Sequence, residues 1–137
     1  MDQLIEQFFQ QFERANTSSD LATIGRLYAD TFMFGGANGV KVVKKEDFLK
    51  VVPRMKAHYA SMGLSGTELM TLEASALDKR YILAKARWRM TLRDLNGDRK
   101  PIDAFATYLL ESKEDNTLSI IVQIDHQDLA TLIKQST

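Results

Sequence analysis

The stretch RYILAKARWRMTLRDLNGDRK, residues 80–100, decides the fold of this chain. Over residues 80–94 apolar side chains alternate with cationic ones, which is the period of a strand that buries one face. Asn96-Gly97-Asp98 favours a hairpin, so a second strand should return antiparallel over residues 100–113. The apolar set is Ile82, Ala84, Ala86, Trp88, Met90 and Leu92, and the cationic set is Lys85, Arg87, Arg89 and Arg93.

The same strand pattern continues on both sides of this hairpin. Strand-like periods also occupy residues 66–78 and 117–126. The turns that join them to the hairpin, Asp78-Lys79 and Glu114-Asp115-Asn116, are short, and short turns connect antiparallel neighbours. We therefore predict four consecutive antiparallel strands in one sheet, with Trp88 on the side that the helices cover.

The sequence before residue 66 is mostly helical. Apolar residues recur there at helical spacing in three segments, which lie over residues 2–16, over residues 20–28 and over residues 44–62. A short strand over 31–34 and a glycine-rich loop over 35–39 separate the second segment from the third. A short helix over 127–135 closes the chain.

Four residues should mark where these helices begin, break or end. Thr17 and Asp20 resemble a capping box for the second helix. Pro53 removes a helix hydrogen bond, so it predicts a kink or break within the third helix. Gly63 should end that helix.

Three helices followed by an antiparallel sheet make a single α+β domain over residues 1–137. The helices should cover one face of a strongly curved sheet and leave a cone with a hollow end. With 137 residues, the chain has no room for a second core.

The composition narrows the classes of function. Lys plus Arg and Asp plus Glu both number 18, so the chain lacks the basic surplus that nucleic-acid binding usually needs. The absence of cysteine excludes disulfides, thiolate nucleophiles and Cys-ligated metals. No signal peptide and no apolar run of about 20 residues is present, so we expect a cytoplasmic protein with no membrane span.

The order of elements resembles the nuclear transport factor 2-like superfamily of α+β cones, which includes SnoaL-like polyketide cyclases and ketosteroid isomerases. Four stretches carry the resemblance across nearly the whole chain: FFQQFERA, LYADTFMF, YILAKARWRM and IIVQIDHQDLATLIKQ. The superfamily hosts isomerases, dehydratases, cyclases, transport adaptors and binding proteins, so the resemblance implies a fold rather than a single function. It also implies that a homodimer forms through the sheet.

Asp125 and Asp128 are the candidate catalytic residues. The resemblance to SnoaL-like cyclases implies Asp128 as the acid–base residue, although this chain has no histidine over residues 100–113, where those enzymes place a partner histidine. Asp125 is an equal candidate by its distance from the last strand. Alternatively, both carboxylates belong to a helix start, with Asp125 as the N-cap and Asp128 as the third helical residue.

The hollow end of the cone should bind a small, mostly apolar molecule. Its expected lining is aromatic or flexible with few polar groups, as small-molecule sites usually are. His126 borders the same corner, and the two histidines, His58 and His126, have no ligand-like spacing, so we expect no metal and no cofactor. The expected lining residues are Tyr28, Phe32, Phe34, Met55, Tyr59, Trp88, Met90, Tyr108, Gln123 and His126.

The other face of the sheet should be covered by a second copy of the chain. The strands over 100–113 and 117–126 are largely apolar on both faces, and a sheet with one wet side does not require that. A self-complementary apolar patch gives a two-fold homodimer. The cationic stripe of the strand over 80–94 should pair with neighbouring acids such as Glu73 or Asp103, or else bind an anion.

Three hypotheses for the function follow. The first is a protein that binds a small molecule without chemistry. The second is an isomerase, dehydratase or cyclase with Asp128 or Asp125 as general base, and with Tyr59 or Tyr108 donating to a developing oxyanion. The third is a non-catalytic protein-interaction module.

Overall fold

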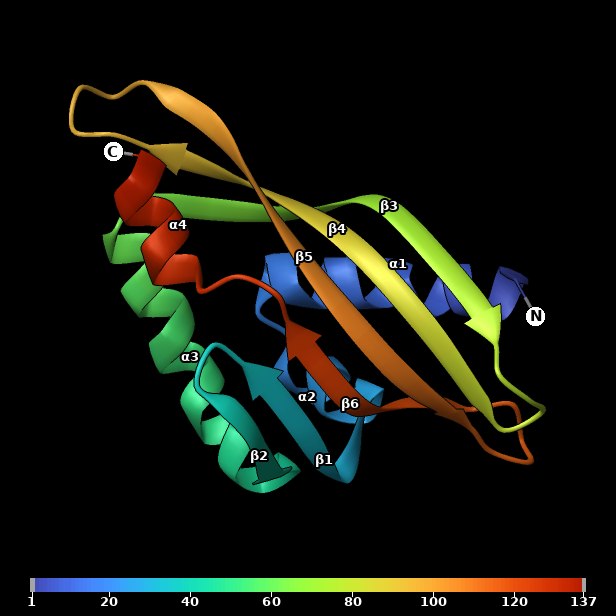
Figure 1. Cartoon of the computed structure of the whole chain (residues 1–137). Coiled ribbons are helices and arrows are strands. Elements are labelled where there is room, and N and C mark those ends of the chain that lie inside the picture. The colour runs from blue at the N-terminus through green and yellow to red at the C-terminus, as the bar shows by residue number, and fades with distance from the viewer. Residues whose placement is uncertain (1, 137) are drawn as a thin grey trace.

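A computed structural model describes residues 2–136 as one α+β fold of four helices and six strands (Figure 1). The helices are α1 (Asp2–Ser18), α2 (Leu21–Leu27), α3 (Lys45–Ser61) and α4 (Leu129–Ser136). The strands are β1 (Tyr28–Gly36), β2 (Gly39–Lys44), β3 (Leu64–Ala76), β4 (Tyr81–Arg93), β5 (Arg99–Ser112) and β6 (Leu118–Asp125).

The six strands form one sheet in the order β2-β1-β6-β5-β4-β3. Strands β3 to β6 are antiparallel neighbours, as the alternation and the short turns predict. β1 joins this sheet by pairing parallel with β6, and it carries β2 as an antiparallel hairpin at the edge. The expected short strand over 31–34 is therefore one arm of a hairpin, and the expected loop at 35–39 is mostly strand and turn.

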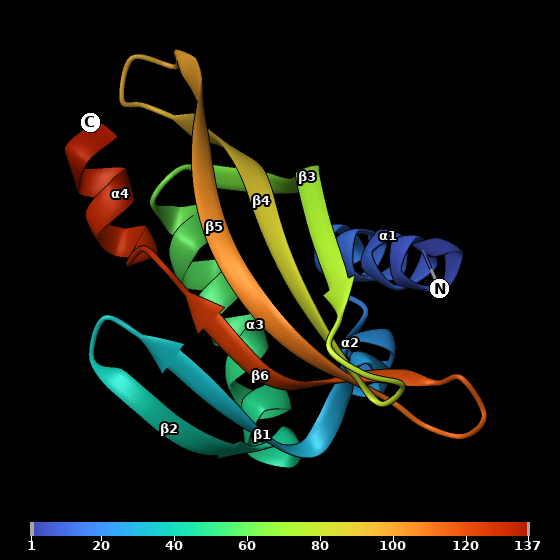
Figure 2. The same cartoon turned by 45° about the vertical axis from the view of Figure 1, so that its right-hand side comes forward.

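The helices lie on the Trp88 side of the sheet, and Figure 2 shows α1 and α3 on that side. Trp88 is 7% exposed, and its ring lies 5.4 Å from the ring of Phe12 on α1. From α3, Phe48 packs against Tyr28 of β1, with the ring centres 4.9 Å apart and the rings tilted by 53°. All six apolar residues of the alternating set in β4 are buried, so the predicted face is confirmed.

Two clusters of buried side chains fill the space under the sheet. The main cluster joins α1, α2 and β1 to the centre of the sheet and contains the aromatic residues Phe9, Phe12, Tyr28, Trp88 and Tyr108. The wide-end cluster is smaller, and Tyr59 of α3 and Leu129 of α4 pack against it. It consists of Leu64, Met90, Leu92, Ile102 and Ile133.

The helix α3 ends where the sequence predicts, but it does not break at Pro53. Pro53 is exposed, and the buried Val52 beside it packs in the main cluster, so tertiary contacts hold the helix across the proline. Gly63 follows the helix with φ +94°. A Cβ there would lie 2.3 Å from the carbonyl oxygen of Arg93, so only glycine fits this turn.

The tetrapeptide Asp-Leu-Ala-Thr occurs twice, at residues 20–23 and 128–131, and starts a helix each time. The Asp20 carboxylate accepts hydrogen bonds from the backbone N–H of Thr23 at 3.2 Å and from its hydroxyl at 2.7 Å. These bonds lower the pKa of Asp20. Asp20 itself is therefore the N-cap of α2, and the expected capping box from Thr17 is wrong because Thr17 still belongs to α1.

A β-bulge in β6 reverses which side chains face the helices. Leu110 of β5 pairs with Ile120, but its neighbour Leu109 pairs with Val122, so β6 advances by two residues where β5 advances by one. Ile121 is the extra residue. Before the bulge Ile120 is buried under the sheet, and after it Val122 faces outward with Leu109. Regular alternation would put Ile120, Val122 and Ile124 on one face of β6, and the bulge prevents this.

Candidate functional site

The bulge places the carboxylate of Asp125 on the helix side of the sheet. Gln123 and Asp125 pair with Tyr108 and Ala106 of β5, and both of those residues are buried under the sheet. Without the extra residue at 121, the parity of the strand would carry Asp125 to the outer face.

A short chain of hydrogen bonds holds Asp125 in place. The hydroxyl of Tyr28 donates to Oε1 of Gln123 at 2.5 Å, and Nε2 of Gln123 donates to Oδ1 of Asp125 at 3.0 Å. The amide of Gln123 is thereby fixed in one orientation. Among residues 2–136, no donor to Oδ2 of Asp125 accompanies these bonds, so that oxygen can accept from another molecule.

Burial raises the pKa of Asp125 above its ordinary value, because the charged form loses contact with water. The hydrogen bond from Gln123 and the nearby His126 act in the opposite direction. A carboxyl group that is held inside a fold with a raised pKa is the usual form of a general acid or base.

The negative charge of Asp125 raises the pKa of three tyrosines. Burial raises the pKa of Tyr28 and Tyr108 strongly, and the negative charge of Asp125 raises both further. Burial, Asp128 and Asp125 together raise the pKa of Tyr59. Tyr28 and Tyr108 belong to the main cluster and Tyr59 packs on the wide-end cluster. Asp125 therefore lies at the seam between the two clusters, and we call this place the seam.

Asp128 also raises the pKa of Tyr59, but its carboxylate is exposed and is bonded to the start of α4. Its carboxylate accepts from the backbone N–H of Thr131 at 3.3 Å and from the hydroxyl of Thr131 at 2.6 Å. This geometry repeats that of Asp20 and Thr23 at the start of α2. Asp128 is exposed and caps α4. The non-catalytic alternative gave this role of N-cap to Asp125, so the cap lies three residues later than expected. The repeated tetrapeptide is the feature of the sequence that could have identified it.

Half of the ten expected lining residues are buried in the core. Tyr28, Phe32, Trp88 and Tyr108 are buried in the main cluster. The indole N–H of Trp88 donates to the hydroxyl of Tyr108 at 3.0 Å. Their side chains fill the narrow part of the cone.

The remaining expected residues are spread over three places. Met90 is buried in the wide-end cluster, away from the aromatic group. Phe34 is half-buried against the main cluster, and Met55 is 40% exposed on α3. With Tyr59 and Gln123, these two residues are the members of the set, apart from His126, that are at least partly exposed.

His126 lies on the outer side of the sheet edge. It is exposed, and its Nε2 is 2.7 Å from the hydroxyl of Thr107, which faces outward beside Ile124. The structure therefore separates His126 from the other expected lining residues. Among residues 2–136, no three His, Asp or Glu side chains gather in a way that could hold a metal ion.

The best-formed surface hollows lie away from the seam. One is a groove between α1 and β3 that Glu13, Thr17 and Leu69 help to line. The other lies between the turns after β3 and β5, beside Arg80 and Asn116. Within the part of the chain that the structure describes, no helix is long and apolar enough to cross a membrane.

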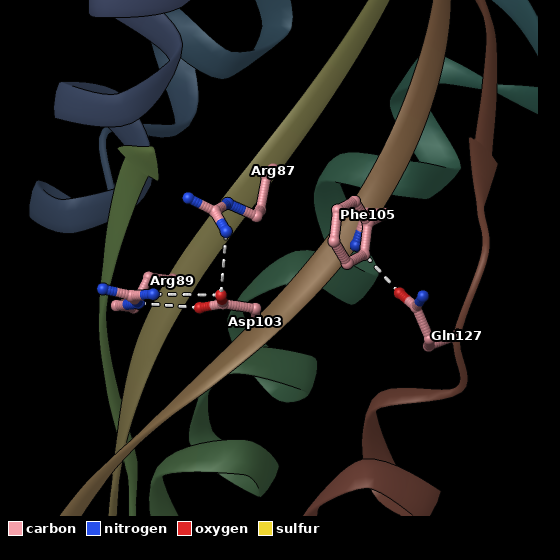
Figure 3. A network of polar contacts seen from close by, with 5 residues as sticks. All are labelled: Arg87, Arg89, Asp103, Phe105 and Gln127. Carbon is pink, nitrogen blue, oxygen red and sulfur yellow. Dashed lines mark hydrogen bonds and ion pairs between the residues drawn. The ribbon is translucent and has the colours of Figure 1, made fainter. Parts of the chain in front are cut away.

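The outer face of the sheet carries an ion-pair cluster, as the cationic stripe of β4 predicts (Figure 3). Asp103 accepts a two-pronged hydrogen bond from Arg89, at 2.7 Å from Nε and 3.0 Å from Nη2. This contact lowers the pKa of Asp103 and raises that of Arg89. Of the two acids suggested as partners, Asp103 fills this role.

Solved structures share this fold at low sequence identity. An NTF-2 like protein of unknown function from Shewanella oneidensis MR-1 is 18% identical with a TM-score of 0.69, covering 92% of this chain and 98% of its own. Aln2 from a Streptomyces species is 12% identical with a TM-score of 0.72, and the match covers 97% of this chain and 93% of Aln2. A ketosteroid isomerase-like protein from Erwinia carotovora atroseptica is 13% identical with a TM-score of 0.67, covering 90% and 92%. At these identities the likeness shows the fold alone.

No protein of curated function matches the sequence. A family model described as NTF2-like protein (DUF6841) matches residues 1–128, nearly the whole chain. The curved sheet, the helices over its Trp88 side and this match agree with one another. The chain therefore belongs to the NTF2-like family DUF6841.

Proposed function

We propose that the chain binds a small, mostly apolar molecule at the seam, with Asp125 as its polar anchor. The observation that carries this proposal is the position of Asp125: the bulge turns its carboxylate under the sheet, and Gln123 holds one oxygen of it. The second oxygen can accept a hydrogen bond from a hydroxyl group. Tyr59, which feels the charge of Asp125 in its pKa, and Phe34, which pairs with Gln123, offer partly exposed apolar surface beside it.

The two hollows described above do not include the seam, so we expect the ligand to move side chains as it enters. We therefore expect a small ligand with one hydroxyl group.

The test uses 2-naphthol as the probe, with its fluorescence followed as protein is added. We expect saturable binding that weakens about fivefold or more in Asp125→Asn, because the acceptor changes from a carboxylate to an amide oxygen. Asp128→Asn is the matched control, since asparagine caps a helix as well as aspartate does. Equal affinity in both variants and the wild type would contradict the proposal. Native mass spectrometry of protein from its own host would then identify a retained natural ligand.

A second candidate function is proton transfer by Asp125 as general base. The raised pKa of Asp125 favours it, as does the nearby Tyr59 hydroxyl, which could donate to a developing oxyanion. We expect isomerisation of a β,γ-unsaturated cyclic ketone to its conjugated isomer, followed by ultraviolet absorbance. Asp125→Asn should abolish this activity and Asp128→Asn should keep it. Conversion no faster than in buffer would leave the binding function alone.

We also propose that a second copy of the chain covers the outer face of the sheet. A row of apolar side chains crosses five strands there, because Val42 pairs with Met33, Met33 with Val122, Val122 with Leu109, and Leu109 with Leu83. Val42 is 71% exposed and Met33 is 43% exposed, so the row is open to solvent in a single chain.

Light scattering at micromolar concentration tests this dimer. We expect the wild type to be dimeric and Val42→Asp to be monomeric, because the new charge would have to lose its water in the interface. Lys41→Asp is the control on the same strand, since neighbouring residues of a strand face opposite sides. A monomeric wild type would remove the dimer from the proposal.

A further inference from the structure

Arg87 on the outer face of β4 has fewer hydrogen-bond acceptors around it than its guanidinium group has donors. Both oxygens of Asp103 already accept from Arg89, and Nη1 of Arg87 reaches Oδ2 of Asp103 only at 3.6 Å (Figure 3). Nε of Arg87 is buried and has no hydrogen-bond partner among the described residues. The buried Nε of Arg87 is therefore an unmet donor, and the one carboxylate that Arg87 reaches is shared with Arg89.

The register of the sheet shows why Arg87 differs from its neighbours. Lys85 has Glu73 opposite it on β3, and Arg89 has Glu68 on β3 and Asp103 on β5. Arg87 has Thr71 on one side and Phe105 on the other, so no acid lies directly opposite it, and Asp103 reaches it only from the position opposite Arg89. A buried donor without an acceptor is unfavourable, and an anion that reached Arg87 would relieve it after a small rotation of the side chain.

The surroundings of Arg87 favour a ligand with a flat apolar body. Phe105 is 46% exposed, whereas the aromatic rings of the main cluster are buried. Its backbone N–H donates to Oε1 of Gln127 at 2.8 Å, and the amide nitrogen of Gln127 has no hydrogen-bond partner among the described residues. Figure 3 shows Phe105 between Arg87 and Gln127. An exposed ring beside a guanidinium group is a platform on which another aromatic ring can stack.

We propose that Arg87, Phe105 and Gln127 form a binding site for a carboxylate that is attached to an aromatic ring. The guanidinium group would hold the carboxylate by a two-pronged charge-assisted hydrogen bond, and the ring would lie on Phe105. The site lies on the opposite face of the sheet from Asp125, so it does not rest on the function proposed for the seam. It shares the outer face with the row of apolar side chains proposed as the dimer contact, but Arg87 and Phe105 lie four residues along β4 and β5 from Leu83 and Leu109 of that row.

The experiment titrates the full chain with 2-naphthoate and follows fluorescence anisotropy. We expect saturable binding that falls about tenfold or more in Arg87→Gln, because the charged partner of the carboxylate is removed. Arg93→Gln is the matched control, since it removes one cation from the same face of the same strand outside the cluster. Arg87→Lys should also bind weakly, because lysine keeps the charge but cannot form the fork. Phe105→Leu should weaken binding several-fold, since the ring loses its platform.

Unlabelled 2-naphthol, which lacks the carboxylate, should not compete with 2-naphthoate for this site. Two results would overturn the proposal: wild-type affinity in Arg87→Gln, or an equal loss in Arg87→Gln and Arg93→Gln. A carboxylate could also come from a second copy of the chain. If 2-naphthoate does not bind and Arg87→Gln only weakens the dimer in light scattering, the small-molecule site is wrong. Asp103 keeps its pairing with Arg89 in Arg87→Gln, and an unchanged Tm confirms that this variant folds.

Discussion

The hydroxyl of Tyr108 accepts a hydrogen bond that the core depends on, and Tyr108→Phe removes it without removing the ring. The indole N–H of Trp88 donates to this hydroxyl at 3.0 Å, and the two residues are only 7% and 2% exposed. The rings of Phe9 and Phe12, at 5.3 and 5.7 Å, hold the phenyl ring in the same place in the variant. The change therefore isolates the loss of one acceptor.

The expected cost follows from the burial of the indole. Water cannot replace the lost acceptor at Trp88, so the variant carries an unpaired buried donor, which costs about 2 kcal/mol. For a chain of 137 residues this corresponds to a fall in Tm of roughly 6–10 °C. Urea denaturation should show a lower midpoint with an unchanged slope. Trp88 is the only tryptophan, so its emission reports the same site directly.

Tyr81→Phe is the control for Tyr108→Phe. Tyr81 is half-buried at the start of β4, and its hydroxyl makes no hydrogen bond to the described residues. Its loss should change stability by less than about 0.5 kcal/mol. If Tyr108→Phe cost no more than Tyr81→Phe, the pairing of the indole with Tyr108 would be refuted as a source of stability.

Three further predictions concern single positions. Gly63→Ala should cost more than about 2 kcal/mol in urea denaturation, because its Cβ would meet a backbone carbonyl, whereas Gly66→Ala, at φ +71° with open space around it, should cost clearly less. Burial raises the pKa of Asp125 above 3.8, so the folded chain holds this proton to higher pH than the unfolded chain does. The wild type should therefore lose stability as the pH rises from about 4 through the raised pKa. In urea denaturation at a series of pH values, the stability of Asp125→Asn relative to the wild type should rise across that window and stay constant above it. Asp128→Ala should lower stability by roughly 1 kcal/mol in thermal unfolding while Asp128→Asn does not, and equal Tm values in the two would show that the carboxylate is no cap.

The sequence was sufficient to predict the elements that rest on local patterns. The alternation around Trp88, the turn at Asn96-Gly97-Asp98 and the helical spacing of the N-terminal apolar residues each depend on neighbours a few positions apart. They predicted the antiparallel strands β3 to β6 and the helices on the Trp88 side. The parallel pairing of β1 with β6 joins residues about 90 positions apart, and no local pattern indicates it. The strand β2 was missed because six residues next to a helix start give too short a period to distinguish.

The candidate site was predictable only in part. Both aspartates were identified, but their roles depend on the bulge in β6, and three apolar residues in a row, Ile120 to Val122, hide which of them is extra. Three of the aromatic residues expected in the lining pack against Phe12 of α1, and sequence spacing does not distinguish such a core position from a pocket wall. The unpaired Nε of Arg87 follows from cross-strand register, which the sequence alone does not give.

Because of the extra residue in β6, the length of this strand decides which of its side chains face the inside of the cone. Removing one residue at position 121 would exchange the two sides of everything that follows, so that Val122 and Ile124 turned toward the helices and Gln123 and Asp125 toward solvent. The same amino acids would then give an apolar helix side of β6 and an acidic outer side. Among chains of this family, a one-residue gap or insertion at this point is therefore a better guide to whether an ionisable group lies inside than the presence of the aspartate itself.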